Sequence, residues 1–318
     1  MSIYDSVDSL FINVIHDIMS NGHEVESRNG MSKECIGAQL ILENLDHPFL
    51  MNERRKLSPY YACAEILWYL QFTNSIEMIK AYAPQYEKYA DEAGNTNGAY
   101  GFRFWNNLKS ARKENINQLD LVIETLKNNP DSRQAVITFW AADDLFAAIN
   151  ASSKDVPCTL SLQYIIRDNK LNAITTMRSN DVWLGMPYDI FAFTCLQRLI
   201  AQALGIKCGG YIHQVGSLHI YEKHWKSAIE AMKNPYFIRN HKPIWATEES
   251  ADWRAEVKEC LRVEKCTRKG IPTITHFADS NTTEMMFDLV VTATHLWKGG
   301  VPLTLSFDLL KGIENVNH

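Results

Sequence analysis

The chain has 318 residues, of which 46% are hydrophobic and 22% charged, and its formal net charge is −5. This composition is typical of a soluble globular protein and excludes collagen-like and wholly disordered chains. The slight acidic excess argues against a protein that coats nucleic acid, although a few converging Arg side chains could still bind an anionic small molecule. Seven scattered Cys without a CxxC motif predict reduced thiols rather than disulfides or a zinc site. Because we find no apolar run of about 18 residues and no basic leader, we expect a cytoplasmic protein with no membrane segment.

Periodicity and end signals predict the elements in chain order. In the first half we expect a helix over 5–19, a polar turn over 27–30, a buried helix over 58–72 that starts at a Ser-Pro pair, a loop over 91–98, an amphipathic helix over 113–128 and a strand over 135–140. In the second half we expect a strand hairpin from 159–167 and 171–178, an apolar helix over 190–204 that Gly205 ends, a strand over 211–221, and helices over 249–263 and 285–297.

The order of these elements predicts the fold class. Strands and helices mix without strict alternation, which favours a mixed α/β (α+β) sheet with flanking helices over a doubly wound sheet. The charge density rises after about residue 245. We therefore predict a main domain over 1–245 and a mainly helical C-terminal extension over 246–318 that packs on it.

The expected hairpin brings a thiol close to a guanidinium. If Arg167 pairs with Leu171 across a three-residue loop, Cys158 lies opposite Asn180, one or two residues from Arg178, and a slip of one or two residues keeps that neighbourhood. A guanidinium stabilises the thiolate form of a cysteine, and it can also hold an anion through paired hydrogen bonds. Taken alone, the pair is more typical of a small core residue and a surface charge.

Glu65 is the only charged residue between Ser58 and Phe72. Its neighbours three and four positions away on the expected helix are all apolar or aromatic. A carboxyl group in such a setting has a raised pKa and can shuttle protons, but it can also be a structural carboxylate satisfied by a buried hydroxyl or water. His219 and Tyr221 lie two positions apart on an expected strand and therefore share one face.

Several motifs stand in a compatible order between about residues 20 and 230. They are Arg28, the run 65–70, Tyr100-Gly101, the run 130–133, Pro157-Cys158, Gln163-Tyr164, the runs 178–181 and 184–189, and the run 219–221. Together they resemble thymidylate synthases and their phage pyrimidine hydroxymethylase relatives. The stretches 177–182 and 215–219 are most similar to the phage deoxycytidylate (dCMP) hydroxymethylases.

The resemblance implies a thymidylate-synthase-like mixed sheet, a homodimer formed through that sheet, and 5,10-methylenetetrahydrofolate as co-substrate, with no metal. Cys158 would add to C6 of a pyrimidine, Glu65 would organise water and proton transfers, and Tyr100 would assist removal of the C5 proton. The implied substrate-binding residues are Arg28, Arg178, Ser179, Asn180, His219 and Tyr221, with Arg133 reaching over from the partner subunit. The implied folate-binding residues are Asp181, Tyr86 and Gly185.

Asp189 indicates which base is bound, because the synthases carry Asn at this position. Uracil presents an N3 donor and an O4 acceptor, whereas cytosine presents the reverse pattern. A carboxyl group accepts from the N4 amino group and, when protonated, donates to N3, and a mismatched buried pattern discriminates by about 10⁴–10⁵. We therefore predict dCMP as the substrate. Asp189 also suits a helix N-cap before Ile190, and the two roles are compatible.

The product depends on how well the folate excludes water, because both outcomes pass through the same exocyclic methylene on C5. Hydride gives a methyl group and water gives a hydroxymethyl group. The departures from the synthases are Tyr86 and Tyr89 in place of Trp, Thr159 in place of His, Gln134 in place of a second phosphate-binding Arg, and a polar end at 315–318. Gln134 predicts weaker phosphate binding. The two Tyr, Thr159 and the polar end predict a looser site and a hydroxymethyl product. By analogy with phage relatives this product would supply modified cytosine for DNA, in the host cytoplasm if phage-encoded. Methylation of dCMP follows if 246–318 closes the site; CMP or dUMP as substrate and a non-catalytic nucleotide-binding role also remain open.

Overall fold

The computed structural model describes residues 2–27, 29–46, 48–106, 116–150, 153, 155–233, 253–269 and 271. The strands are β1 (Ser2–Tyr4), β2 (His23–Ser27), β3 (Gly30–Leu42), β4 (Val136–Thr138), β5 (Thr159–Arg167), β6 (Lys170–Asp181) and β7 (Lys207–Tyr221). The helices are α1 (Val7–Asn21), α2 (Pro59–Tyr69), α3 (Tyr100–Asn106), α4 (Gln118–Asn128), α5 (Ala142–Ile149), α6 (Met186–Leu204), α7 (Glu222–Lys233) and α8 (Trp253–Arg268), with short 3₁₀ turns η1 (Ile79–Ala81) and η2 (Pro84–Tyr89).

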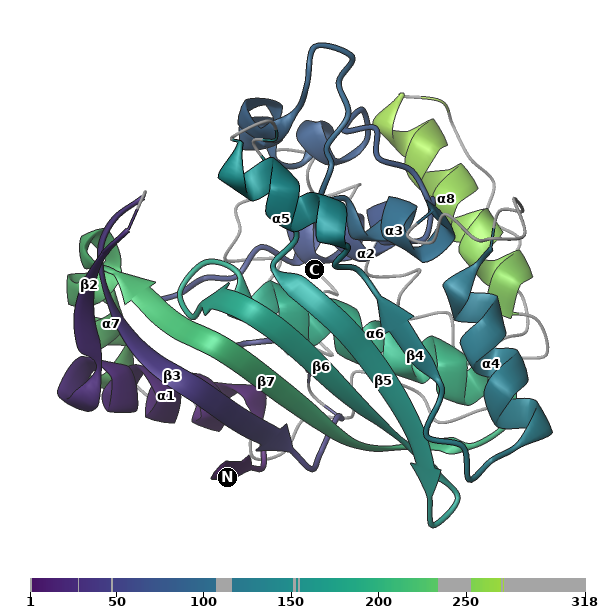
Figure 1. Cartoon of the computed structure of the whole chain (residues 1–318), viewed down its shortest axis with the longest axis horizontal. Coiled ribbons are helices and arrows are strands. Elements are labelled where there is room, and N and C mark those ends of the chain that lie inside the picture. The colour runs from purple at the N-terminus through teal and green to yellow at the C-terminus, as the bar shows by residue number, and fades with distance from the viewer. Residues whose placement is uncertain are drawn as a thin grey trace, which may run out of the picture.

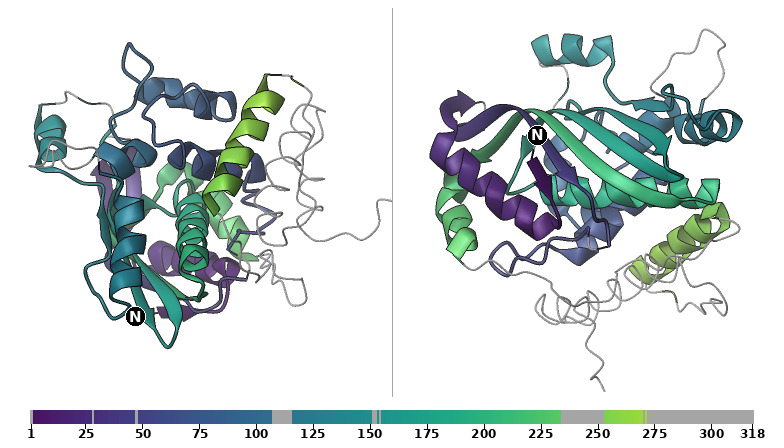
Figure 2. Two further views of the ribbon diagram at one scale, coloured as in Figure 1. Left: turned by 90° about the vertical axis from the view of Figure 1, so that its right-hand side faces the viewer. Right: turned by 90° about the horizontal axis from the view of Figure 1, so that it is seen from below.

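A seven-stranded mixed sheet organises the fold (Figure 1). Its order is β1-β3-β7-β6-β5-β4, with β2 paired to β3. The β1–β3 and β6–β7 pairs are parallel and the other pairs are antiparallel. Helices α1 and α6 pack against one face (Figure 2), and Phe11, Phe191 and Tyr211 are fully buried between these layers. The expected mixed sheet with flanking helices is confirmed.

The helix starts and stops that depend on local signals are largely confirmed. The hydroxyl of Ser58 caps α2 by accepting the N–H of Tyr61, and Pro59 occupies the first helical position. Helix α6 ends at Gly205, whose φ of 67° is left-handed. The expected boundaries differ by a few residues: α2 ends three residues before Phe72, α6 begins at Met186 instead of 190, and α4 begins at Gln118. Residues 113–115 of the expected helix lie outside the described residues.

The largest omission of the sequence prediction is the β2–β3 hairpin. Ser27 and Gly30, at the two ends of the expected polar turn, pair as the last residues of the hairpin, and β3 extends over 13 residues and pairs with β7. The polar residues Lys33, Glu34 and Gln39 interrupt the apolar pattern of β3, so the chain shows no clear alternation there. Most of its length pairs with β7, which is distant in sequence.

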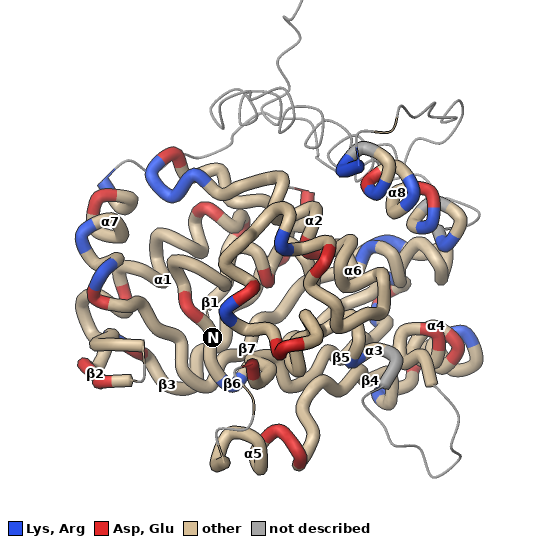
Figure 3. The backbone as a smooth tube through the Cα atoms, turned by 90° about the horizontal axis from the view of Figure 1, so that it is seen from above, with Lys and Arg blue, Asp and Glu red and all other residues tan. Residues whose placement is uncertain are grey.

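Of the proposed extension over 246–318, the structure describes α8 and a few residues after it. Helix α8 contacts α2 and α6, and Figure 3 shows its Lys and Arg positions interleaved with acidic ones. Arg268 and the buried Glu264 form an ion pair of 2.7 Å on this helix, and Tyr82 donates to the same carboxylate at 3.0 Å. The boundary at 245 stays a prediction, and the helix expected over 285–297 lies outside the described residues. In the described part of the chain, no helix has the length and apolar character needed to cross a bilayer.

Candidate active site

Cys158 lies directly before β5, and the backbone N–H of Arg178 on β6 donates to its carbonyl at 2.9 Å. The hairpin closes with two residues in left-handed conformation, Asp168 and Asn169, so Arg167 pairs with Lys170. A bulge between Thr159 and Ser161 shifts the register again. The expected pairing of Cys158 with Asn180 is therefore wrong by two residues, and the thiol lies beside Arg178 itself.

The environment of the Cys158 thiol contains opposing influences. Burial raises the pKa of the thiol, and the carboxylates of Asp189 and Asp155 raise it further, while the charge of Arg178 lowers it. A guanidinium nitrogen of Arg178 lies 3.6 Å from Sγ. The expected stabilisation of the thiolate by Arg178 is thus present, but burial outweighs it in the free protein.

Glu65 lies on α2 within a cluster of tyrosines. The hydroxyl of Tyr61 donates to its Oε1 at 2.6 Å and that of Tyr86 at 3.2 Å, and the two hydroxyls lie 2.9 Å apart. Burial raises the pKa of Glu65 to about 7, although the hydroxyls of Tyr61, Tyr86 and Tyr69 oppose the shift. A carboxyl group with this pKa can hold or release a proton near neutral pH.

Tyr100 begins α3, and its hydroxyl accepts the backbone N–H of Thr159 at 3.2 Å. Its ring packs against those of Tyr69 and Phe139, with centroid distances of 5.3 and 5.0 Å. Burial raises the pKa of Tyr100 well above its usual value, and the nearby charges of Cys158 and Asp189 contribute. Tyr100 therefore stands next to the residue that follows Cys158 and remains protonated over the physiological range.

Asp189 lies in the first turn of α6 and is half-buried. Gly185, not Asp189, is the N-cap of this helix, so the expected capping role is wrong. The amide of Asn180 donates to Oδ2 of Asp189 at 2.8 Å. Burial raises the pKa of Asp189 well above its usual range, and the charges of Glu65 and Asp181 act in the same direction. A Cβ at Gly185 would lie 3.2 Å from this carboxyl, so a residue without a side chain suits the position.

Asp181, the last residue of β6, is a second carboxylate near Asp189. Its Oδ1 accepts the backbone N–H groups of Trp183 and Leu184 at 2.8 and 3.1 Å. Its Oδ2 is buried and has no hydrogen-bond partner among the described residues. Such an oxygen is suited to accept an N–H from a bound molecule.

Tyr86 and Tyr89 belong to one aromatic group on η2. Their ring centroids lie 6.0 Å apart at nearly right angles, and Tyr86 also contacts Trp68 at 5.4 Å. Tyr89 is 38% exposed, whereas Tyr86 is tied to Glu65 through its hydroxyl. Tyr86 is expected to bind folate, and its bond to Glu65 is not predicted by the sequence.

The expected sugar-binding and phosphate-binding residues lie at the same end of the sheet. His219 pairs in register with Asp181, and Ser179 pairs with Ser217. The rings of His219 and Tyr221 make an edge contact with a centroid distance of 5.0 Å.

One of the expected arginines is not brought to this site by the chain itself. Arg133 is exposed, and its carbonyl accepts the side-chain amide of Gln163 at 2.9 Å. Gln163 is five residues from Cys158 along β5, which corresponds to about 17 Å. Arg28 lies outside the described residues.

Two charged residues near the site were missed by the sequence analysis. Asp155 accepts the N–H of Gly98 at 2.8 Å, and a Cβ at Gly98 would lie 2.7 Å from the same oxygen. Arg55 donates to the carbonyl of Leu184 at 3.3 Å and lies over the ring of Tyr188. The closeness of Asp155 to Cys158 in sequence was a usable signal, whereas Arg55 gave none because its partners are more than a hundred residues away.

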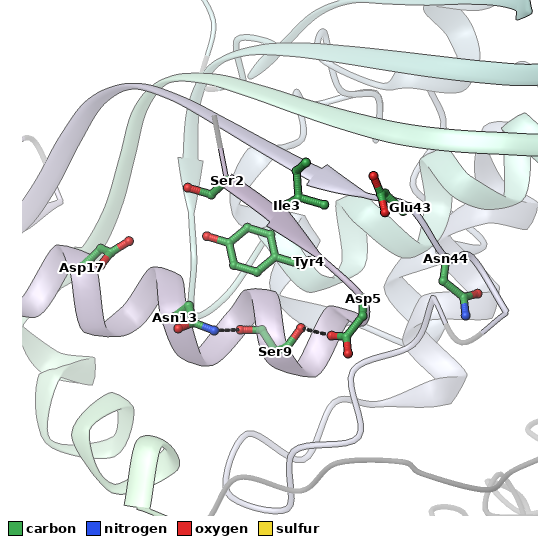
Figure 4. A pocket seen from close by; sticks show the side chains of 9 residues that line it. All are labelled: Ser2, Ile3, Tyr4, Asp5, Ser9, Asn13, Asp17, Glu43 and Asn44. Carbon is green, nitrogen blue, oxygen red and sulfur yellow. Dashed lines mark hydrogen bonds between the residues drawn. The ribbon is translucent and has the colours of Figure 1, made fainter.

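A separate hollow of about 650 Å³ lies between β1, α1 and the end of β3 (Figure 4). Its described lining includes the carboxylates of Asp5, Asp17 and Glu43 and no Lys or Arg. Carboxylates repel a phosphate, so this hollow does not suit a nucleotide. No group of three or more His, Cys, Asp or Glu that could hold a metal occurs within the described residues.

Comparisons with known proteins agree with this arrangement. Residues 9–250 match the family described as "Thymidylate synthase". The chain is 29% identical over 259 residues to "Thymidylate synthase 1" of Bacillus spizizenii and to "Thymidylate synthase" of Bacillus phage phi3T, in each case covering 77% of this chain and 90% of the relative. The solved "thermostable thymidylate synthase A from Bacillus subtilis" superposes with a TM-score of 0.63 at 27% identity, covering 73% of this chain and 86% of that one. The chain belongs to the thymidylate synthase family, whose enzymes are transferases that carry a one-carbon unit from methylenetetrahydrofolate to a nucleotide.

Proposed function

We propose that this enzyme transfers the one-carbon unit to C5 of dCMP and releases 5-hydroxymethyl-dCMP. The observation that carries the proposal is the carboxyl group of Asp189, held by Asn180 close to Cys158 and Glu65, with a pKa raised well above its usual range by burial. A neutral carboxyl group donates to N3 of cytosine through one oxygen and accepts from the N4 amino group through the other. Uracil presents the opposite pattern at both positions, and a buried mismatch is costly.

The reaction begins at Cys158. Its thiolate forms a bond to C6 of the cytosine ring, and the electron pair of the C5–C6 double bond moves to C5, which becomes nucleophilic. The charge of Arg178 opposes the effect of burial on the pKa of the thiol and so favours the thiolate. C5 would bond to the one-carbon unit of the co-substrate methylenetetrahydrofolate, the bonds from that carbon to the two folate nitrogens would break as tetrahydrofolate leaves, and water would supply the oxygen of the hydroxymethyl group. The hydroxyl of Tyr100 assists loss of the C5 proton, and the S–C6 bond breaks at the end.

The described residues fit a bound folate. The unpartnered Oδ2 of Asp181 can accept an N–H group of the pterin, and the rings of Tyr86 and Tyr89 offer flat apolar surface to it. The tyrosine hydroxyls around Glu65 can hold a water molecule, and Glu65, with a pKa of about 7, can take a proton from that water as it adds to the exocyclic methylene. These polar groups support hydroxymethylation over hydride transfer.

Arg178 and Ser179 hold the 5′-phosphate, and His219 and Tyr221 bond the sugar hydroxyl. Arg133 from a second copy of the chain is a further phosphate ligand. The sheet face opposite α1 and α6 supports this dimer, because it carries a row of half-buried isoleucines in register, Ile41, Ile212 and Ile174. Covering such a row removes apolar surface from water.

The names of the relatives favour a second candidate, methylation of dUMP as in a thymidylate synthase. One experiment separates the two candidates, namely release of tritium from [5-³H]dCMP and [5-³H]dUMP with methylenetetrahydrofolate, combined with the product mass. We expect release from dCMP, a hydroxymethyl product and no dihydrofolate. Release from dUMP alone would overturn the base assignment, a methyl product would overturn hydroxymethylation, and tight dCMP binding without release would indicate a non-catalytic binding protein.

Asp189→Asn provides the matched variant, since an amide presents a donor and an acceptor as uracil requires. We expect the preference to move from dCMP towards dUMP. An unchanged preference would remove Asp189 from base recognition.

A further inference from the structure

A chain of buried polar groups continues behind Asp189. Asn180 donates to Oδ2 of Asp189, and the amide oxygen of Asn180 lies 2.8 Å from Nε2 of His213. Nδ1 of His213 lies 2.9 Å from the hydroxyl of Tyr211. The hydroxyl of Tyr211 also lies 2.9 Å from that of Thr175. His213, Tyr211 and Thr175 are fully buried. The mechanism proposed above uses none of these three residues.

The topology explains why these residues meet. Thr175 and His213 are register partners on the parallel strands β6 and β7. Both strands pack beneath α6, the helix that carries Asp189. These hydrogen bonds therefore connect the face of the sheet beneath α6 to the carboxyl group of Asp189, which is proposed to recognise the base.

The protonation of His213 follows from its partners. Burial lowers the pKa of His213 to about 3, so the ring is neutral and carries one proton. The oxygen of the Asn180 amide can only accept, so that proton belongs on Nε2. Nδ1 then carries no proton, and the hydroxyl of Tyr211 lies 2.9 Å from both Nδ1 and Oγ1 of Thr175, to either of which it can donate its one proton. Neutral His213 thus holds the amide oxygen of Asn180 and leaves its N–H group pointing at Asp189.

This orientation assigns a different role to each oxygen of Asp189. Oδ2 receives the N–H of Asn180 and is therefore an acceptor, which the N4 amino group of cytosine also requires. Oδ1 remains the oxygen that bears the proton facing N3. If the Asn180 amide turned over, its oxygen would favour a proton on Oδ2, and Oδ1 would become an acceptor that suits the N3–H of uracil.

We propose that His213 is a positioning residue that sets base specificity by fixing the orientation of the Asn180 amide against Asp189. The inference rests on the proposed dCMP activity and deepens it. Loss of the Nε2–H donor leaves the Asn180 oxygen buried without a partner, and the amide becomes free to turn. The expected consequence is a lower preference for dCMP over dUMP, not a uniform loss of activity.

The test compares His213→Leu with His213→Gln, whose amide N–H can replace the Nε2–H donor. The measurements are kcat/KM for tritium release from dCMP and dUMP, and calorimetric binding of each nucleotide without folate. We expect His213→Leu to lower the dCMP-to-dUMP ratio by about tenfold or more and His213→Gln to retain most of it. Tyr211→Phe, which removes only the hydroxyl that bonds Nδ1, should lower the ratio in the same direction by a smaller factor and serves if the Leu variant fails to fold.

The dCMP-to-dUMP ratio of the wild-type enzyme distinguishes a failure of the proposed function from a failure of the inference about His213. If the wild-type enzyme shows no preference for dCMP in either measurement, the proposed function fails. If the wild type prefers dCMP and a folded His213→Leu or Tyr211→Phe variant loses activity and binding equally for both nucleotides, His213 has a structural role only and this inference is overturned.

Discussion

The guanidinium of Arg178 lies 3.6 Å from Sγ of Cys158 and is held there by the chain that carries the cysteine. It donates to the carbonyl of Pro157 at 2.9 Å and to that of Val156 at 3.1 Å, and it lies over the ring of Trp140. These contacts fix the positive charge next to the thiol before any substrate binds. Because the guanidinium is already in place, less conformational entropy is lost when the reacting groups are brought together.

Removing this charge should make Cys158 less reactive. In Arg178→Ala the pKa of the thiol, already raised by burial, should rise further, so alkylation by iodoacetamide near neutral pH should slow and its pH midpoint should move upward. Arg178→Lys should restore part of the reactivity. Peptide mass spectrometry measures the rate at Cys158, and Cys35 on β3 provides an internal control. An unchanged pH midpoint at Cys158 would show that the arginine has no influence on the thiol.

Glu65 offers a test of proton transfer with little structural change. Glu65→Gln keeps an oxygen that can accept from Tyr61 and Tyr86, but it cannot exchange a proton. We expect the rate of tritium release to fall by about 10²–10⁴ and the pH dependence near neutrality to disappear. Tyr61→Phe removes a bond that lowers the pKa of Glu65, so its pH profile should move to higher pH. The hypothesis fails if the Gln variant keeps the wild-type profile.

The site shows which information is local in the sequence and which is not. The apolar run around Glu65 predicted a raised pKa, and the pattern around Cys158 predicted the neighbouring arginine, because both depend on residues of one helix or one hairpin. Tyr86, by contrast, reaches Glu65 from a separate turn 21 residues away. The bond between His213 and Asn180 joins two strands across 33 residues. No periodicity in the sequence indicates such contacts.

The secondary structure likewise contains elements that local sequence signals specify and elements that depend on distant contacts. Apolar spacing located α1, and caps and turns located the start of α2, the end of α6 and the β5–β6 hairpin, since each is specified by neighbouring residues. Strand β3 was missed because its identity depends on pairing with β7, nearly 180 residues further on. The two-residue turn and the bulge of the β5–β6 hairpin could not be predicted from the sequence either. Together they shift the register by two residues, so that Arg178 and not Asn180 lies opposite Cys158.

Arg133 allows a test of the proposed dimer. In its own chain it lies far from Cys158, so we expect it to complete the site of a second subunit. Arg133→Ala and Cys158→Ala should each be nearly inactive alone. When the two variants are unfolded and refolded together in equal amounts, half of the dimers are mixed, and each mixed dimer has one intact site, so about a quarter of the wild-type activity should return. Mixing without recovery, with dimers verified by sedimentation, would contradict a shared site.

Asp8 of α1 should make stability depend on pH. It is buried, its Oδ2 accepts the N–H of Met51 at 3.1 Å, and its Oδ1 has no partner among the described residues. Burial raises the pKa of Asp8 to about 7. In the unfolded chain an aspartate titrates near pH ~4, so the unfolded state loses this proton first as the pH rises. The contribution of Asp8 to stability is therefore complete below about pH 4 and is lost as the pH rises to about 7.

Asp8→Asn isolates this effect, because the amide oxygen still accepts from Met51 and the side chain cannot ionise. Between about pH 5 and pH 7.5 the free energy of unfolding in urea should fall more for the wild type than for the variant, by about 1–3 kcal/mol. Asp17→Asn, which removes an exposed carboxylate from the same helix, should retain the wild-type dependence. Parallel curves for the wild type and Asp8→Asn would mean that Asp8 ionises alike in the folded and unfolded chains, and its burial would then have no effect on the pH dependence of folding.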